Sequence, residues 1–194
     1  MPIARTRTRI SLIALAGAAL AAPAGAQDWF KHPFGELRSY HLDWLAICAE
    51  DGAGSCRVVY SAADIGSGAA FDRRLTLRYD EAAETWTPEV MDRGMPSGEL
   101  SQLAFSFDGD DAVYVPTGAY VAGEAGAADV AETVTVTDAD LIADIVAEMR
   151  AGKALAVTYF PKGTGDGSAE FSLRGVRDAQ AAVEAHVAKR GKGA

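Results

Sequence analysis

Short runs of alternating apolar and polar side chains, separated by turn residues, constrain the fold of this chain more than any other feature. One run begins at Ser39 and continues through Trp44 to Cys48, and a second runs from Cys56 to Ser61. Successive side chains of a strand point to opposite faces of a sheet, so alternation of this kind predicts β-strands. Many short strands with frequent turns favour a sandwich or a barrel.

The alternation predicts further strands downstream, and glycine-rich or acidic turns divide them. These strands are expected at residues 75–79, 103–107, 112–115, 130–136, 154–160 and 169–173. Turns are expected at Asp108-Gly109-Asp110 and over Lys162 to Ser168, because glycine and aspartate favour tight turns. The stretch from Gly118 to Ala128 is rich in glycine and alanine and is interpreted as a flexible loop or a thin sheet edge.

Two segments have helical periodicity instead. Leu141, Ile145 and Met149 recur on one helical face, so a helix is predicted over Asp138 to Ala151. Thr137 precedes it with Asp140 three residues on, an arrangement that predicts a capping box with Thr137 as the N-cap. A second, alanine-rich helix is predicted over residues 176–189, so the fold class is mainly β with one or two short helices.

The chain contains two cysteines, Cys48 and Cys56, one at the facing end of each of the first two predicted runs. In an exported protein such an even pair indicates a disulfide, which here would tie one hairpin. A redox Cys-x-x-Cys motif has two intervening residues, whereas seven intervene here. A zinc site would require more ligands than this neighbourhood offers, because His41 is the only histidine near the pair in the sequence.

The first 26 residues have the features of a cleavable signal peptide. Arginines precede an apolar run from Ile10 to Ala22, and Ala24-Gly25-Ala26 provides the small residues that a signal peptidase recognises. The apolar run is too short to cross a bilayer core, which takes about 20 residues. We therefore expect export to the periplasm or beyond, a mature chain starting at Gln27, and no stable membrane insertion after cleavage.

The remaining chain is predicted to form a single domain over residues 27–190, followed by a frayed tail at 191–194. Without the three signal-peptide arginines it has 15 basic and 27 acidic residues, a net charge of −12. So negative a domain repels phosphate backbones, which argues against nucleic-acid binding. A basic protein partner is the better match for this charge.

No catalytic constellation is predicted. The three histidines, His32, His41 and His186, lie far apart in the sequence, and there is no Gly-x-Ser-x-Gly motif. We therefore assign no catalytic, cofactor-binding or metal-binding residue, and we expect neither a cofactor nor enzyme activity.

Two acidic or glycine-rich segments were weighed as sites. Asp108, Asp110 and Asp111 offer oxygen ligands for calcium, but they lack the spacing and closing glutamate of an EF-hand loop. A solvated turn is the better interpretation of these acids. The segment Gly163 to Gly167 precedes a predicted strand and not a helix, so a hairpin turn is favoured over a phosphate-binding loop.

Several motifs resemble the invasion-associated locus B family of exported, alphaproteobacterial-type proteins. Asp43-Trp44, Cys48 and Gly54-x-Cys56 are similar to that family's opening half. Residues 149–153, Val157-Thr158-Tyr159 and the segment Phe171-Ser172-Leu173-Arg174-Gly175 are similar to its closing half. The order matches over Leu42 to Ala182, whereas residues 62–137 carry no family motif, and the second cysteine pair of some relatives is missing.

The resemblance implies an immunoglobulin-like β-sandwich in the periplasm or on the surface of a Gram-negative cell, without enzyme activity or cofactor. The favoured hypothesis is a non-catalytic envelope protein that binds another protein, as a cell-envelope or host-interaction module. One alternative is a small apolar-ligand carrier whose pocket is lined by Trp44, Trp86 and Phe105. A remote alternative is a carboxylate-dependent hydrolase that uses Asp108 and Asp111.

Overall fold

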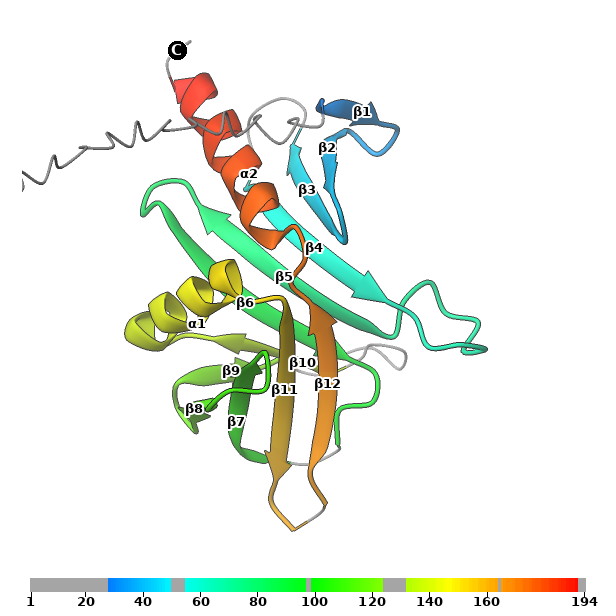
Figure 1. Cartoon of the computed structure of the whole chain (residues 1–194), viewed down its shortest axis with the longest axis vertical. Helices are drawn as coiled ribbons and strands as arrows, with labels where there is room; N and C mark the ends of the chain where they lie inside the picture. Colours follow the sequence, from blue (N-terminus) through cyan, green and yellow to red (C-terminus); the bar gives the residue numbers. More distant parts are fainter. Residues whose placement is uncertain (1–27, 50–54, 97–98, 124–131, 164, 192–194) are drawn as a thin grey trace, which may run out of the picture.

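The computed structural model describes residues 28–49, 55–96, 99–123, 132–163 and 165–191. The predicted signal peptide therefore lies outside the described residues, as do part of the loop predicted at 118–128 and most of the tail. In this part of the chain the structure has two antiparallel sheets and two helices, which confirms the predicted mainly β fold with a β-sandwich (Figure 1).

The larger sheet has eight strands, and its first six follow one another in chain order. In sheet order they are β1 (Phe30–His32), β2 (Glu36–His41), β3 (Trp44–Ala49), β4 (Arg57–Ala62), β5 (Arg73–Asp80), β6 (Thr85–Asp92), β10 (Glu132–Val136) and β9 (Tyr120–Ala122). The smaller sheet has the order β12 (Gly167–Ser172), β11 (Ala154–Pro161), β7 (Leu100–Phe107) and β8 (Val113–Pro116).

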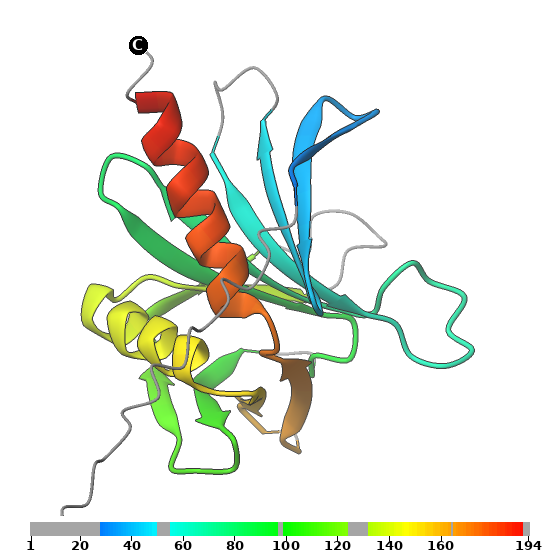
Figure 2. The same ribbon diagram turned by 45° about the horizontal axis from the view of Figure 1, so that its top comes forward.

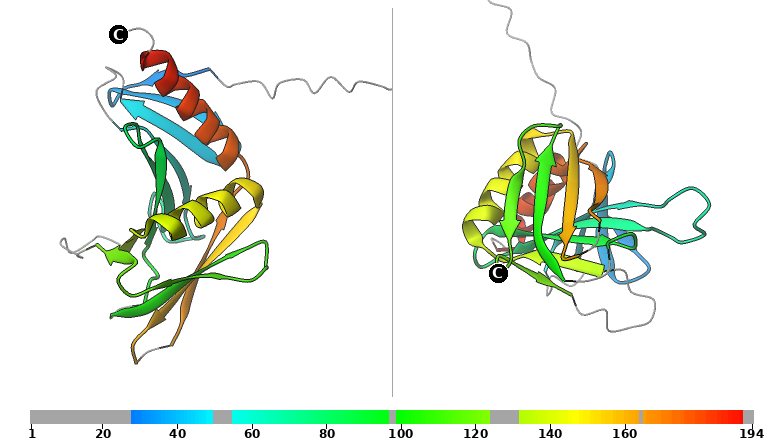
Figure 3. Two further views of the ribbon diagram at one scale, coloured as in Figure 1. Left: turned by 90° about the vertical axis from the view of Figure 1, so that its left-hand side faces the viewer. Right: turned by 90° about the horizontal axis from the view of Figure 1, so that it is seen from below.

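Both helices and the smaller sheet cover the same face of the eight-stranded sheet (Figures 2 and 3). Helix α1 (Ala139–Ala151) packs on β6, and α2 (Val176–Gly191) packs on β2, β3 and β4. One core joins these layers. Large side chains from each layer are almost fully buried in it, among them Trp44, Leu75, Phe105, Ile145 and Val183.

Helix α2 approaches the sheet closely because its buried positions carry small or medium side chains. Val176, Ala179, Gln180 and Val183 recur at three- and four-residue spacing and are buried. A polar network joins the two helices, since Arg150 donates to Gln180 Oε1 at 2.9 Å and to Glu184 Oε1 at 2.6 Å. Trp86 of β6 donates its indole N–H to the same Glu184 oxygen, so the network also anchors the large sheet.

Two local predictions are wrong. The run from Ser39 to Cys48 is two strands and not one, because the chain reverses at Leu42 and Asp43 and pairs His41 with Trp44. The N-cap of α1 is Asp138 and not Thr137, since the Asp138 carboxylate accepts from the backbone N–H groups of Asp140 and Leu141. An aspartate in this position satisfies helix donors as well as threonine does.

Strand β6 was not predicted from the sequence. It contains Pro88, a residue that normally argues against a central strand. Pro88 pairs with Leu77 of β5, whereas β10 pairs only with residues from Glu89 onward. At Pro88 the strand therefore has a paired neighbour on one side only. A proline is tolerated there because no hydrogen bond to β10 is lost.

Candidate functional site

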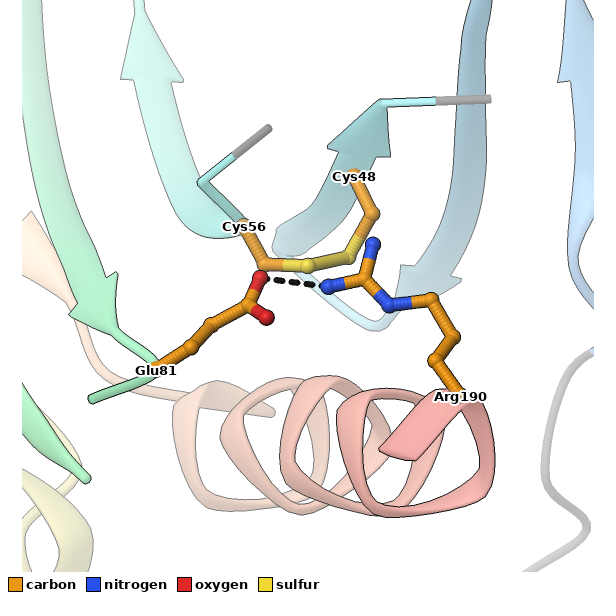
Figure 4. The surroundings of a disulfide bond; sticks show 4 residues. All are labelled: Cys48, Cys56, Glu81 and Arg190. Atoms are coloured by element: carbon orange, nitrogen blue, oxygen red, sulfur yellow. Dashed lines mark hydrogen bonds and ion pairs between the residues drawn. A yellow bond between two sulfur atoms is a disulfide. The ribbon is translucent and has the colours of Figure 1, made fainter. Parts of the chain in front are cut away.

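The two cysteines form the predicted disulfide within the predicted hairpin. Leu45 pairs with Val59 and Ile47 with Arg57, a register that places Cys48 opposite Cys56, and the sulfurs are bonded. Both cysteines are fully buried. Figure 4 shows the bond beside the ion pair between Arg190 of α2 and Glu81, so the end of α2 is held over it. The geometry is that of a protected structural cross-link.

The two groups of motif residues that carry the family resemblance are in direct contact. Ser172 donates its hydroxyl to the Asp43 carboxylate at 2.6 Å, and its carbonyl accepts from the Trp44 indole at 2.9 Å. Asp43 N–H donates to Arg174 O at 3.3 Å. The Asp-Trp and Ser-Leu-x-Gly segments are thus the two sides of one junction between the large sheet and the entry to α2.

Gly175 allows this junction to close. Its φ is +95°, and a Cβ atom there would lie 2.0 Å from the His41 carbonyl oxygen, far closer than van der Waals contact allows. Leu42, in the opposing turn, also has a positive φ of 54°. Two backbones therefore approach so closely that only glycine fits at position 175.

Asp108, weighed above as a calcium ligand or catalytic acid, has a structural role. Its carboxylate accepts from Lys153 N–H at 3.0 Å and from Ala154 N–H at 2.8 Å, at the corner between α1 and β11. Asp110 and Asp111 face a separate surface hollow beside Glu148. Asp108 therefore lies at the α1–β11 corner, whereas Asp110 and Asp111 lie in the hollow beside Glu148.

The three histidines lie on three different elements. His32 is on β1, and His186 of α2 stacks against Trp29 with ring centroids 4.7 Å apart. His41 is buried on β2, with Nε2 3.1 Å from the Ser39 hydroxyl, and burial lowers its pKa while Asp178 opposes that shift. Among the described residues, no group of three His, Cys, Asp or Glu side chains is placed to hold a metal ion.

The aromatic residues considered for a ligand pocket are part of the core. Trp44, Trp86 and Phe105 are buried among side chains of both sheets and the helices. Strands β11 and β12 pair antiparallel with Tyr159 opposite Gly167, as the predicted hairpin requires, and residue 164 of its turn lies outside the described residues. None of the helices in the described residues has the length and apolar character that crossing a bilayer requires.

A cluster of exposed aromatic side chains on the β1–β2 hairpin was missed by the sequence analysis. Phe34 is 80% exposed and Tyr40 is 52% exposed, and the rings of Phe30 and Tyr40 stack at 5.7 Å. The Arg38 guanidinium lies 5.8 Å from the centre of the Phe34 ring. We call Phe30, Phe34, Arg38 and Tyr40 the aromatic surface. Its only sequence signal was two phenylalanines in the segment before the first predicted strand.

A groove of about 850 Å³ lies where the edge of the smaller sheet meets the ends of β4 and β5. Its walls include Tyr60, Ala62 and Arg73 on one side and Glu170 with Ser172 on the other. We call it the edge groove.

Tyr159 lies on the neighbouring strand β11, and its hydroxyl is buried with no hydrogen-bond partner among the described residues. Burial, followed by the negative charge of Asp92, raises the pKa of this phenol.

No protein-family model and no curated protein sequence matches the chain. A similar solved structure is that of invasion associated protein B from Bartonella henselae, with a TM-score of 0.53 and 15% sequence identity. The similarity covers 77% of this chain and 96% of the Bartonella chain. The resemblance inferred from the short motifs is thus confirmed at the level of the fold, and the chain shares the fold of invasion associated protein B.

Proposed function

We propose that this chain is a non-catalytic, exported envelope protein that binds another protein through the aromatic surface. The fold shared with invasion associated protein B and the buried disulfide support an extracytoplasmic protein of this type, because such bonds persist in oxidising compartments. The exposed aromatic surface is the observation that carries the binding role.

Phe30, Phe34 and Tyr40 favour a protein partner for a physical reason. Large aromatic side chains, together with arginine, dominate the energetics of protein interfaces, and contiguous exposed apolar patches commonly mark them. Here Phe30, Arg38 and Tyr40 lie on the adjacent strands β1 and β2, where Phe30 pairs with Arg38, and Phe34 lies in the turn between these strands. A partner that covers them removes apolar area from water at little entropic cost, since aromatic side chains have few rotatable bonds.

The net charge of the mature chain predicts how salt affects binding. At −12 the domain attracts a basic partner over a distance of about 10 Å, and salt screens this attraction. Binding is therefore expected to weaken at high salt without disappearing, since burial of the rings is insensitive to screening.

Capture from a native envelope extract at low and high salt tests the proposal. The bait is the mature protein, compared with a triple variant, Phe30→Ser, Phe34→Ser and Tyr40→Ser. The control variant is Ile65→Ser with Tyr114→Ser, which removes two other exposed apolar side chains away from the β1–β2 hairpin. We expect one protein to be retained by the wild type and the control, and its recovery to fall at least tenfold with the triple variant.

Equal recovery of the partner with the wild type, the triple variant and the control variant would show that the aromatic surface is not the binding site. Failure to capture any protein, together with hydrolytic activity lost in Asp111→Asn, would replace it with an enzyme. Asp111 is the better test residue because Asp108 supports the backbone of the α1–β11 corner.

A further inference from the structure

Strand β12 has one open edge. It pairs with β11 on one side, and no other strand of the described residues pairs with it on the other (Figure 1). The two ends of this edge are covered. Trp44 reaches Ser172 at one end, and Pro96 lies against Gly167 at the other, where a Cβ would come within 2.6 Å of it. Between them, Ser168 and Glu170 are exposed.

The backbone of these two residues points outward. Leu173, just after the strand, donates its N–H to Lys153 O on the β11 side, whereas Ser172 directs its carbonyl to Trp44 on the opposite side. In an antiparallel strand the N–H and C=O of one residue point to the same side, and the side alternates along the chain. The N–H and C=O groups of Ser168 and Glu170 therefore point to the open edge, as those of Ser172 do.

The edge groove begins at Glu170 and Ser172 of this edge and continues over the outer face of the smaller sheet, where Ala156 and Ser106 also line it. Tyr60, Ala62 and Arg73 form its opposite wall, and the Tyr60 ring meets Phe171 edge-on with centroids 6.1 Å apart. The Arg73 side chain is part-exposed and pairs with Asp64, whose carboxylate is largely in solvent. An exposed pair of this kind holds its partners weakly, so the Arg73 guanidinium is available to a stronger acceptor.

We propose that the edge groove binds an extended peptide segment of a partner protein, which adds a strand to β12 and directs an acidic side chain to Arg73. A row of outward N–H and C=O groups is complementary to an extended backbone, and strand addition of this kind is a general mode of peptide recognition. Side chains of the added strand alternate between the wall with Tyr60 and Arg73 and the side with Glu170.

This site is distinct from the aromatic surface, because β3 separates β1 and β2 from β4, which forms one wall of the groove, in the order of the large sheet. The inference therefore goes beyond the proposed function, and each can fail without the other.

A proline substitution tests the backbone contact directly. Glu170→Pro removes one outward N–H and places a ring on the open edge, but it leaves the hydrogen bonds to β11 in place. Glu170→Ala is the matched control, since it removes the same side chain and keeps the N–H. Circular dichroism and thermal unfolding establish that both variants are folded.

The probe is a phage-displayed library of random heptapeptides, selected on the mature wild-type protein. Selected peptides are then synthesised with a fluorescent label and titrated by fluorescence polarisation. We expect peptides that contain Asp or Glu, whose affinity falls at least tenfold for Glu170→Pro and for Arg73→Gln. Affinity for Glu170→Pro is expected to be at least tenfold weaker than for Glu170→Ala, which keeps the outward N–H. Affinity for the Phe30, Phe34 and Tyr40 triple variant is expected to stay within twofold of the wild type.

Selection of no peptide, or of peptides that bind wild type and Glu170→Pro equally, would overturn the inference. Loss of binding in Glu170→Ala equal to that in Glu170→Pro would also overturn it, because recognition would then depend on the side chain and not on the backbone edge.

Discussion

At the scale of single residues, the family-like motifs are explained by the hydrogen bonds that their side chains and backbone make with one another. Ser172, Asp43 and Trp44 exchange two hydrogen bonds across 128 and 129 residues of sequence. Gly175 then allows the chain to pass the His41 carbonyl on its way into α2. The short motifs carry information about the fold because they form a single packed junction.

Replacement of Gly175 by alanine tests this junction. A positive φ costs an ordinary residue about 1–2 kcal/mol, and the clash with His41 O adds to that cost. We expect Gly175→Ala to lower the free energy of unfolding by about 4 kcal/mol or more, measured by urea denaturation. Gly163→Ala is the control, because its φ is +80° but no atom lies within 4 Å of the added Cβ. Equal effects of the two substitutions would refute the close approach.

At the scale of elements, the β3–β4 hairpin combines three stabilising features that belong to different levels of structure. Its two strands are neighbours in sequence and pair with each other. The disulfide links these strands at positions that lie opposite each other, and α2 covers both cysteines. The Arg190–Glu81 pair attaches the end of α2 to the neighbouring β5–β6 turn. The cross-link therefore holds the part of the sheet on which α2 packs.

Removal of the disulfide is expected to destabilise the protein without abolishing its fold. Closing a loop of this length lowers the entropy of the unfolded chain by an amount worth about 2.5 kcal/mol. For a domain of this size that corresponds to a fall in Tm of roughly 5–10 °C. Differential scanning calorimetry of a double variant, Cys48→Ala with Cys56→Ala, measures it. An unchanged Tm, or two free thiols in the unreduced wild type, would contradict the structural role.

At the scale of the whole molecule, one face of the eight-stranded sheet carries almost all of the packing. The helices and the smaller sheet cover that face, and the opposite face carries ion pairs such as Arg78–Glu89 and Arg57–Glu36. Partners are therefore expected at the margins of the covered face and on the uncovered side, where the edge groove and the aromatic surface lie.

The mature chain is expected to begin at Gln27, after cleavage behind the small residues Ala24, Gly25 and Ala26. Intact mass measurement of the protein from a periplasmic fraction checks this, with the species retained in the membrane fraction as the comparison. Recovery of the chain with Met1 intact, held in the membrane, would show that the segment is an anchor and not a cleaved signal.

The sequence by itself determined the features that depend on neighbouring residues. Alternation predicted most strands, and the spacing of Leu141, Ile145 and Met149 predicted α1, because side-chain direction follows directly from local backbone geometry. The disulfide followed from two cysteines at facing ends of one hairpin. The family resemblance indicated the fold.

Only the tertiary structure decided where the chain reverses between β2 and β3, which side chains remain exposed and where a sheet edge is open. The Leu42-Asp43 turn lacks the usual glycine, and its conformation is stabilised by contacts with Ser172 and Arg174. Pro88 is tolerated because β10 pairs only from Glu89 onward. Phe30 and Tyr40 are exposed because α2 covers the opposite face of their sheet. Each outcome depends on segments far apart in sequence, and local patterns carry no record of such contacts.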